Sequence, residues 1–179
     1  MGHTMKIGKK MITEEQLEKR VAELAEELNK YYGDREVIVI GILKGCFVFM
    51  ADLVKRLTCD ARVYFMEISS YNLGTVSSGK ITIKKDLDVD IEGKDVLIAE
   101  DIIDSGNTLS QLTEILKKRN PKSIKVCALL SKPARREVEF EADYTGFEIE
   151  DKFIIGYGLD CGERFRQLPY IAEVEIYDE

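Results

Sequence analysis

The chain has 179 residues, of which 45% are hydrophobic and 33% are charged, and its formal net charge is −7 at pH 7. This length and composition fit one soluble globular domain with a core of useful size. The negative charge, with no Lys/Arg-rich block, disfavours non-specific binding to nucleic acid or to a membrane surface, since both need a basic face.

Cysteine and histidine usage excludes several kinds of site. The four cysteines show no CxxC spacing, which favours buried thiols in a reducing compartment over a disulfide frame or a zinc site: Cys46, Cys59, Cys127 and Cys161. His3 is the single histidine and lies in a ragged start, so Ser–His or Cys–His catalysis and a histidine-based metal site are excluded. No apolar run approaches the roughly 20 residues of a membrane span, and no signal peptide is visible. We therefore expect a cytoplasmic protein.

The first third of the chain predicts a helix, a buried strand and a second helix. "TEEQ" at Thr13–Gln16 matches a capping box, and apolar residues then recur at helical spacing until Gly33-Asp34. "EVIVIGIL" (36–43) is a continuous β-branched run, as expected for a strand buried on both faces. "LKGCFVFMADLVKRL" (43–57) turns and becomes a helix.

Strands and helices alternate through the middle of the chain. Strands are predicted at 61–68, 94–101 and 123–130, and a helix at 107–120 that Pro121 closes off. This alternation implies parallel strands joined by right-handed crossovers. Between strand candidates, the polar segment Ser69–Gly79 has the composition of a mobile loop, and long loops in compact domains are usually functional or disordered.

From about Asp143 the sequence predicts short strands and turns, at 142–149, 152–160 and 170–177. We interpret this segment as a small subdomain packed over the sheet edge and joined by the N-terminal segment. The expected organisation is one domain, with a core at about 33–142 and a hood formed by about 1–12 and 143–179.

The stretch "VLIAEDIIDSGNTLSQL" (96–112) carries the chemistry that can be inferred from residues alone. In open parallel sheets ligands bind at the carboxyl ends of the strands, where Glu100 and Asp101 are expected. The next residues enter a helix whose first N–H groups are unpaired, so Ser105 to Thr108 suit a phosphate monoester. Two of the acids would accept hydrogen bonds from a ribose diol, and Asp104 would accept or donate a proton. The P-loop pattern GxxxxGK[ST] is absent.

Other interpretations of this stretch stay open at this point. Ser105 or Asn107 would serve equally well as the cap of the following helix. Acids at strand ends also occur in phosphoacceptor domains and in magnesium-binding domains. The local pattern therefore makes a sugar-phosphate site one of several interpretations.

"VLIAEDIIDSGNTL" closely resembles the phosphoribosyl pyrophosphate signature of type I phosphoribosyltransferases. Four further segments resemble the hypoxanthine-guanine branch of that family in the same order: "GILKGCFVFMADL", "SSY", "LLSKPARR" and "DKFIIGYGLDCGERFRQLPYI". The resemblance covers nearly everything from Ile12 to Ile176. It implies an α/β fold with a mainly parallel central sheet flanked by helices, a small hood subdomain and a flexible catalytic loop.

The resemblance also implies an activity in purine salvage. Ribose 5-phosphate would pass from phosphoribosyl pyrophosphate to hypoxanthine or guanine, giving IMP or GMP plus pyrophosphate, with Mg²⁺ as cofactor. A homodimer or homotetramer is the assembly expected from the family, with neither nucleic acid nor membrane as a partner.

The acidic stretch receives specific roles from the resemblance. Glu100 and Asp101 match the acids that hold the ribose hydroxyls, and together with Asp160 they are the implied magnesium carboxylates. Asp104 matches the general base or acid beside the purine N7. The 5′-phosphate cradle is matched by Ser105, Gly106, Asn107 and Thr108.

Further roles fall on groups distant in sequence. Lys44 and Gly45 match the pyrophosphate loop, where the family often has a cis peptide before the lysine, and Arg166 matches a pyrophosphate contact. By its own sequence context Lys44 would be a solvated lysine. Ser70 and Tyr71 match the start of the catalytic lid.

The base pocket is matched by three residues. Lys132 would donate to the purine 6-oxygen, the Phe153 ring would stack on the base, and the backbone of Ile154 would contact the base edge. Without the resemblance, Phe153 would be interpreted as a core residue, because apolar residues flank it. Cys161 stands where many relatives carry an aromatic residue, which puts base preference in doubt.

Two other classes of protein are alternatives. A regulator of the same fold that senses phosphoribosyl pyrophosphate and binds nucleic acid would need a basic surface and no Asp104. A phosphoacceptor receiver domain would have no use for the Ser-Gly-x-Thr cradle or for the C-terminal block. Both fit the sequence less well than the enzyme.

Overall fold

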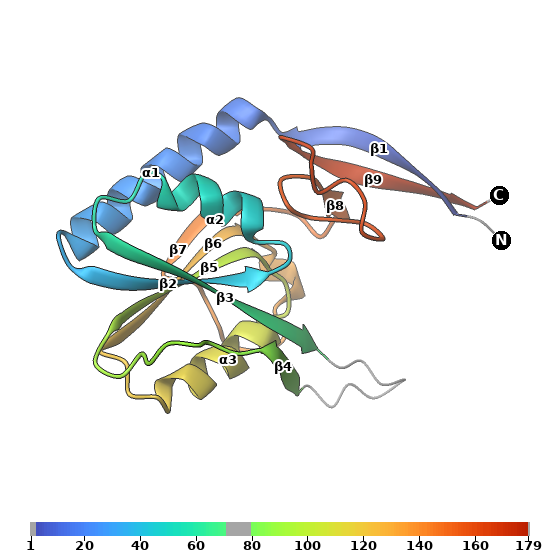
Figure 1. Ribbon diagram of the computed structural model, residues 1–179. Helices are drawn as coiled ribbons and strands as arrows, with labels where there is room; N and C mark the ends of the chain where they lie inside the picture. The colour runs from blue at the N-terminus through green and yellow to red at the C-terminus, as the bar shows by residue number, and fades with distance from the viewer. Residues whose placement is uncertain (1–2, 71–79, 179) are drawn as a thin grey trace.

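The computed structural model describes residues 3–70 and 80–178 of the chain, and these residues form two sheets (Figure 1). The larger sheet has the strand order β4-β3-β2-β5-β6-β7. Its strands are β2 (Glu36–Leu43), β3 (Asp60–Ser70), β4 (Ile81–Lys85), β5 (Asp95–Ile103), β6 (Ser123–Ser131) and β7 (Tyr144–Glu148). All neighbours are parallel except β3 and β4, which confirms the expected mainly parallel sheet.

Helices cover both faces of this sheet. α1 (Glu14–Tyr32) and α2 (Phe47–Val54) lie on one face, and α3 (Asn107–Lys117) lies on the other (Figure 1). The predicted capping box is confirmed: Thr13 Oγ1 accepts from the Gln16 N–H at 3.2 Å, and Gln16 Oε1 accepts from the Thr13 N–H at 2.9 Å. A short 3₁₀ helix, Pro133–Arg135, follows β6.

The core has two layers because successive residues of a strand point to opposite faces. In β2, Val37 and Val39 pack with the residues of α1 and α2, whereas Ile38 and Ile40 pack with those of α3. Six consecutive residues of β2 are therefore buried, as the continuous apolar run predicted.

A second, antiparallel sheet stands at one end of the molecule, with the order β1-β9-β8 (Figure 1). Its strands are β1 (His3–Ile12), β9 (Ile171–Asp178) and β8 (Ile154–Ile155). The N-terminal segment thus joins the C-terminal segment, as expected. We call this sheet and the loop 156–170 the hood.

The expected hood boundary near residue 143 is wrong, because β7 belongs to the larger sheet. Cys127 pairs with Tyr144 and Leu130 with Phe147 in a parallel ladder. α1 secures the same strand, since the Arg20 guanidinium donates to the backbone oxygens of Thr145 and Gly146, each at 2.9 Å. The alternating pattern of 142–149 does not distinguish an edge strand of the core from a strand of the hood.

Several element limits also differ from the sequence-based expectations. β5 continues two residues past Asp101, because Ile102 pairs with Leu130 and Ile103 with Ser131 of β6. α3 ends at Lys117, before Pro121 can act on it, and α2 is shorter than its apolar pattern. β4 was not predicted as a strand.

Two further features concern the expected environment of the chain. Three of the four free cysteines are buried, but Cys161 is partly exposed, which corrects the expectation of a buried thiol there. Among the residues that the structure describes, no helix is long and apolar enough to cross a membrane.

Candidate active site

Two adjoining cavities lie at the carboxyl ends of the central strands. One, of about 200 Å³, is lined by Glu100–Gly106, Thr108 and Leu109. The other, of about 380 Å³, opens between the ends of β5 and β6 and the hood, where Lys132, Phe153 and Ile154 line it. Ile102 and Asp104 line both cavities, so the Asp104 carboxylate is placed where the two meet.

The paired acids Glu100 and Asp101 lie in the second half of β5, where Glu100 ends a run of six buried residues. Burial raises the pKa of Glu100 well above its usual value, and the neighbouring Asp101 charge adds to the effect. Burial also raises the pKa of Asp101. In the described residues neither carboxylate has a Lys or Arg within ion-pair distance. Both therefore have unmet capacity for a cation or for hydroxyl donors.

The helix that follows begins at a glycine. Gly106 is the N-cap of α3 and has φ 82°, in the left-handed region that glycine adopts without strain, and no side chain caps the helix. Ser105 Oγ accepts from the Asn107 N–H at 3.2 Å, and the Asn107 amide donates to Glu137 at 2.6 Å. The capping role considered for Ser105 or Asn107 thus falls to Gly106, while this N-terminus faces the cavity of the acids.

Lys132 lies between two acids. Its side chain is 9% exposed, and its Nζ atom is 3.7 Å from Asp104 Oδ1 and 3.9 Å from Asp151 Oδ1. The Lys132 N–H donates to the Ile103 oxygen at 2.9 Å, which fixes the start of this side chain beside the acidic turn. A buried ammonium is thereby held at the floor of the second cavity.

Phe153 lies exposed at the rim of the same cavity. Its exposed fraction is 57%, whereas that of the adjacent Ile154 is 6%. The interpretation of Phe153 as a core residue is therefore wrong. An exposed aromatic ring and a buried ammonium that line the same cavity suit a planar heterocycle with a polar edge.

The turn after β2 packs against Asp101. The Leu43–Lys44 peptide is cis, as the resemblance implied. A Cβ atom on Gly45 would lie 1.7 Å from Asp101 Oδ2, so only glycine allows this approach. The Lys44–Gly45 turn and the acidic strand end are therefore one packed unit.

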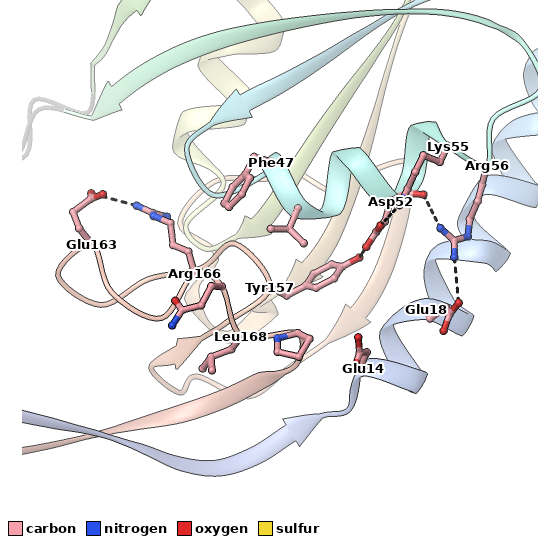
Figure 2. Close-up of a pocket in the computed structure, with 13 residues that line it drawn as sticks. Glu14, Glu18, Phe47, Asp52, Lys55, Arg56, Tyr157, Glu163, Arg166 and Leu168 are labelled. Carbon is pink, nitrogen blue, oxygen red and sulfur yellow. Dashed lines mark hydrogen bonds and ion pairs between the residues drawn. The ribbon is translucent and has the colours of Figure 1, made fainter.

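The hood contributes an ion-pair network to this turn. Arg166 Nη2 is 3.0 Å from Asp160 Oδ1 and 3.3 Å from Glu163 Oε1, and Arg166 Nη1 donates to the Gly158 oxygen at 2.8 Å. Lys44 Nζ is 2.9 Å from Glu163 Oε2. Figure 2 shows Arg166 and Glu163 facing each other on the hood loop. The structure thus brings Lys44, Asp160 and Arg166 together.

The structure does not place the two predicted lid residues in the site, and it does not gather the three predicted magnesium carboxylates into one group. Ser70 ends β3, and Tyr71 lies outside the described residues. Within the described ranges no three acidic, histidine or cysteine side chains gather into a metal-binding group. Asp160 therefore does not join Glu100 and Asp101 in one cluster.

The structure also identifies site residues that sequence reasoning missed. Asp151 accompanies Lys132, and Glu163 joins Lys44 to Arg166. The Arg136 guanidinium donates to the Asp104 backbone oxygen at 2.5 Å and to Ser131 Oγ at 2.7 Å, which buttresses the acidic turn. Arg136 is the second arginine of "PARR", a segment that the resemblance already included. The contacts of Asp151 and Glu163 depend on the tertiary fold and have no signal in the sequence.

The largest cavity described, of about 610 Å³, lies over α2 rather than at the acids (Figure 2). Its Asp52 carboxylate is already paired: the Tyr157 hydroxyl donates to Asp52 at 2.6 Å, and Lys55 lies 2.8 Å from Asp52. The N-terminal residues of α1 and α2 line this cavity, but the acids Glu100, Asp101 and Asp104 do not. The two smaller cavities are therefore the better candidate for chemistry, although the larger one shares Glu163 and Arg166 with the ion-pair network of the hood.

Comparison with known proteins agrees with this geometry. The family model described as a phosphoribosyl transferase domain matches residues 8–161. The hypoxanthine phosphoribosyltransferase of Salmonella typhimurium is 48% identical over all of both chains. A hypoxanthine-guanine phosphoribosyltransferase structure from Bacillus anthracis has a TM-score of 0.90 and 45% identity, and the match covers 96% of this chain and 100% of that one.

Some relatives are longer proteins. The bifunctional protein TilS/HprT of Listeria monocytogenes is 51% identical over 97% of this chain, which spans only 27% of that protein's length.

Proposed function

Since the chain belongs to the phosphoribosyl transferase domain family, we propose that it transfers ribose 5-phosphate from phosphoribosyl pyrophosphate to hypoxanthine or guanine. The products are IMP or GMP and pyrophosphate. The position of Asp104 between the two cavities carries this proposal. One cavity suits a sugar phosphate and the other a purine, so the atoms that exchange would meet beside this carboxylate.

The sugar-phosphate side uses the acidic strand end and the helix N-terminus. Ser105, Gly106, Asn107 and Thr108 hold the 5′-phosphate with backbone amides and hydroxyls, which needs no lysine against the overall negative charge. Glu100 and Asp101 accept from the ribose hydroxyls. Hydroxyl donors or a cation at these carboxylates would offset the burial that raises their pKa values.

Mg²⁺ fits the donor set at this end of the sheet. Two adjacent carboxylates without a cationic partner, and no complete protein cage in the described residues, suit an ion that shares its shell with substrate oxygens and water. When bound, the ion would neutralise charge on the pyrophosphate. We assign Glu100 and Asp101 to it, with Asp160 contributing separately from the hood.

The leaving group is held from the other side. Lys44, Gly45 and Arg166 receive the pyrophosphate, where positive groups stabilise the negative charge that develops as the bond to ribose C1 breaks. Ser70 and Tyr71 remain assigned to the catalytic lid by resemblance alone. On the base side, Lys132 donates to the 6-oxygen, Phe153 stacks on the ring, and the Ile154 backbone meets the base edge.

The nucleic-acid-binding regulator has no observation in its favour. The net charge is −7, and the relatives named above carry the names of enzymes. Retention on a heparin column would be the cheap sign of that alternative, and we expect none.

We also propose a homodimer or homotetramer in the cytoplasm. This assembly is the one that the resemblance to the family implies. Free thiols at all four cysteines fit a reducing compartment. Light scattering coupled to gel filtration measures the assembly directly.

One experiment tests the activity. Ultraviolet absorbance assays with Mg²⁺ and phosphoribosyl pyrophosphate, run separately on hypoxanthine, guanine, xanthine and adenine, should show turnover of hypoxanthine or guanine and none of adenine. No turnover of any base would refute the proposed function.

Gly45→Ala is expected to weaken the use of phosphoribosyl pyrophosphate. The added Cβ must displace the Asp101 carboxylate, because the two would lie 1.7 Å apart. We expect KM for phosphoribosyl pyrophosphate to rise about tenfold or more, the loss of one charged hydrogen bond being about 1.5–3 kcal/mol. Steady-state kinetics measure this, and an unchanged KM in a folded variant would show that Asp101 does not hold the ribose.

A further inference from the structure

Glu163 is the feature of the site that the proposed roles leave unexplained. It is an acid placed among the groups that should receive an anion. Lys44 Nζ lies 2.9 Å from Oε2 and Arg166 Nη2 lies 3.3 Å from Oε1, so each carboxylate oxygen engages one of the two cations. A phosphate group would engage the same two cations in the same bridging manner.

The loop holds the backbone of Glu163 beside the two cations. The Glu163 N–H donates to Asp160 Oδ2 at 2.8 Å, and φ of Glu163 is 62°. Asp160 in turn is 3.0 Å from Arg166. Asp160 therefore contacts both the backbone of Glu163 and the Arg166 cation, and this fixes the main chain of Glu163 close to that cation.

The side chain itself is free to leave. Its exposed fraction is 65% and that of Lys44 is 58%, whereas Arg166 is only 19% exposed. The Lys44 ammonium donates to this carboxylate, which is charged at neutral pH as exposed glutamates are. An exposed pair of this kind is weak and exchanges readily with a stronger anion.

Resting on the proposed function, we propose that Glu163 is an internal counter-ion that competes with the substrate's pyrophosphate for Lys44 and Arg166. It shares its single negative charge between the two cations and keeps them close together until pyrophosphate displaces it. It then limits the affinity for phosphoribosyl pyrophosphate and assists release of the product by re-forming its ion pairs. Glu163 is a positioning residue, because it acts through Lys44 and Arg166.

The test compares Glu163→Gln with the parent chain by calorimetry in Mg²⁺. Removing the charge should tighten binding of phosphoribosyl pyrophosphate about three- to tenfold, the scale of two exposed ion pairs. Binding of GMP should stay within about twofold, because GMP has the 5′-phosphate but no pyrophosphate to meet these cations. Product inhibition by inorganic pyrophosphate should strengthen in parallel with substrate affinity.

Two control variants separate this role from a general change of charge or of fold. Glu114→Gln removes the same charge from an exposed pair with Lys117 on α3, at 2.7 Å and with similar exposure, and should leave both affinities unchanged. Glu163→Asp keeps the charge but is one methylene shorter, so its affinity for phosphoribosyl pyrophosphate should lie between those of the parent and of Glu163→Gln. Thermal unfolding without ligand confirms that each variant is folded.

The outcomes are distinct. Unchanged or weaker binding of phosphoribosyl pyrophosphate by Glu163→Gln would overturn the inference, as would equal tightening for GMP or for Glu114→Gln. If the parent chain converts hypoxanthine, and Glu163→Gln binds phosphoribosyl pyrophosphate as tightly as the parent does, only the role of Glu163 is refuted. A parent chain that neither binds phosphoribosyl pyrophosphate nor forms IMP would refute the proposed function itself.

Discussion

Replacement of Asp104 by asparagine is expected to lower kcat by about 10²–10⁴-fold, the range that a positioned general acid or base contributes. Asparagine has nearly the same shape but cannot exchange the N7 proton. KM for phosphoribosyl pyrophosphate should change by less than about threefold, because the carboxylates and amides that hold the sugar phosphate remain. Steady-state kinetics with hypoxanthine separate the two effects.

Asp151→Asn is the matched control for this prediction. It removes a carboxylate that lies 3.9 Å from the same Lys132 ammonium, against 3.7 Å for Asp104, but it does not line the cavity of the acids. We expect kcat to fall less than about tenfold in this variant. Equal losses in the two variants would mean that both acids act only by neutralising Lys132. Unchanged turnover of Asp104→Asn would refute the proton-transfer role.

Lys132→Ala should cut kcat/KM for hypoxanthine and guanine by about 10- to 150-fold. This range corresponds to about 1.5–3 kcal/mol for a hydrogen bond from a charged donor. The donor is buried, at 9% side-chain exposure, so water does not replace it easily. Affinity for phosphoribosyl pyrophosphate alone should stay close to that of the parent, because Lys132 lines the base cavity and not the cavity of the acids.

Lys132→Met separates the hydrogen bond from packing. Methionine keeps much of the length and volume of the stem but has no ammonium. If its loss matches that of Lys132→Ala, the ammonium rather than the stem recognises the base. Full activity in Lys132→Met, or adenine use by the parent chain, would show that this lysine does not recognise the 6-oxygen.

Much of the fold was predictable because its signals are local. The capping box at Thr13 and the buried run of β2 depend on neighbouring residues and were confirmed. The ends of strands and the sheet that a strand joins depend on pairing with a distant strand, so they were harder to predict from the sequence. β5 extends past Asp101, and β7 joins the larger sheet, because β6 offers each a partner along its length.

In the candidate site too, residues that are adjacent in sequence could be predicted, whereas residues that meet only in the fold could not. The acids and the Ser-Gly-Asn-Thr run are contiguous, so their phosphate-cradle chemistry could be inferred from neighbouring residues alone. By contrast, Lys44 and Glu163 are 119 residues apart, and no local pattern links them. The exposure of Phe153 likewise depends on where the hood places its loop.

The sequence by itself determined most of the local units, though not β4: it showed which other segments become strands or helices, and which stretch can hold a phosphate. Periodicity and capping act over a few residues, so they can be recognised along the chain. The tertiary structure alone decided that Lys132 meets Asp104, that Gly45 touches Asp101, and that Glu163 bridges Lys44 and Arg166. Parallel strands bring their carboxyl ends to one edge whatever their separation in sequence, and there the distant groups form one site.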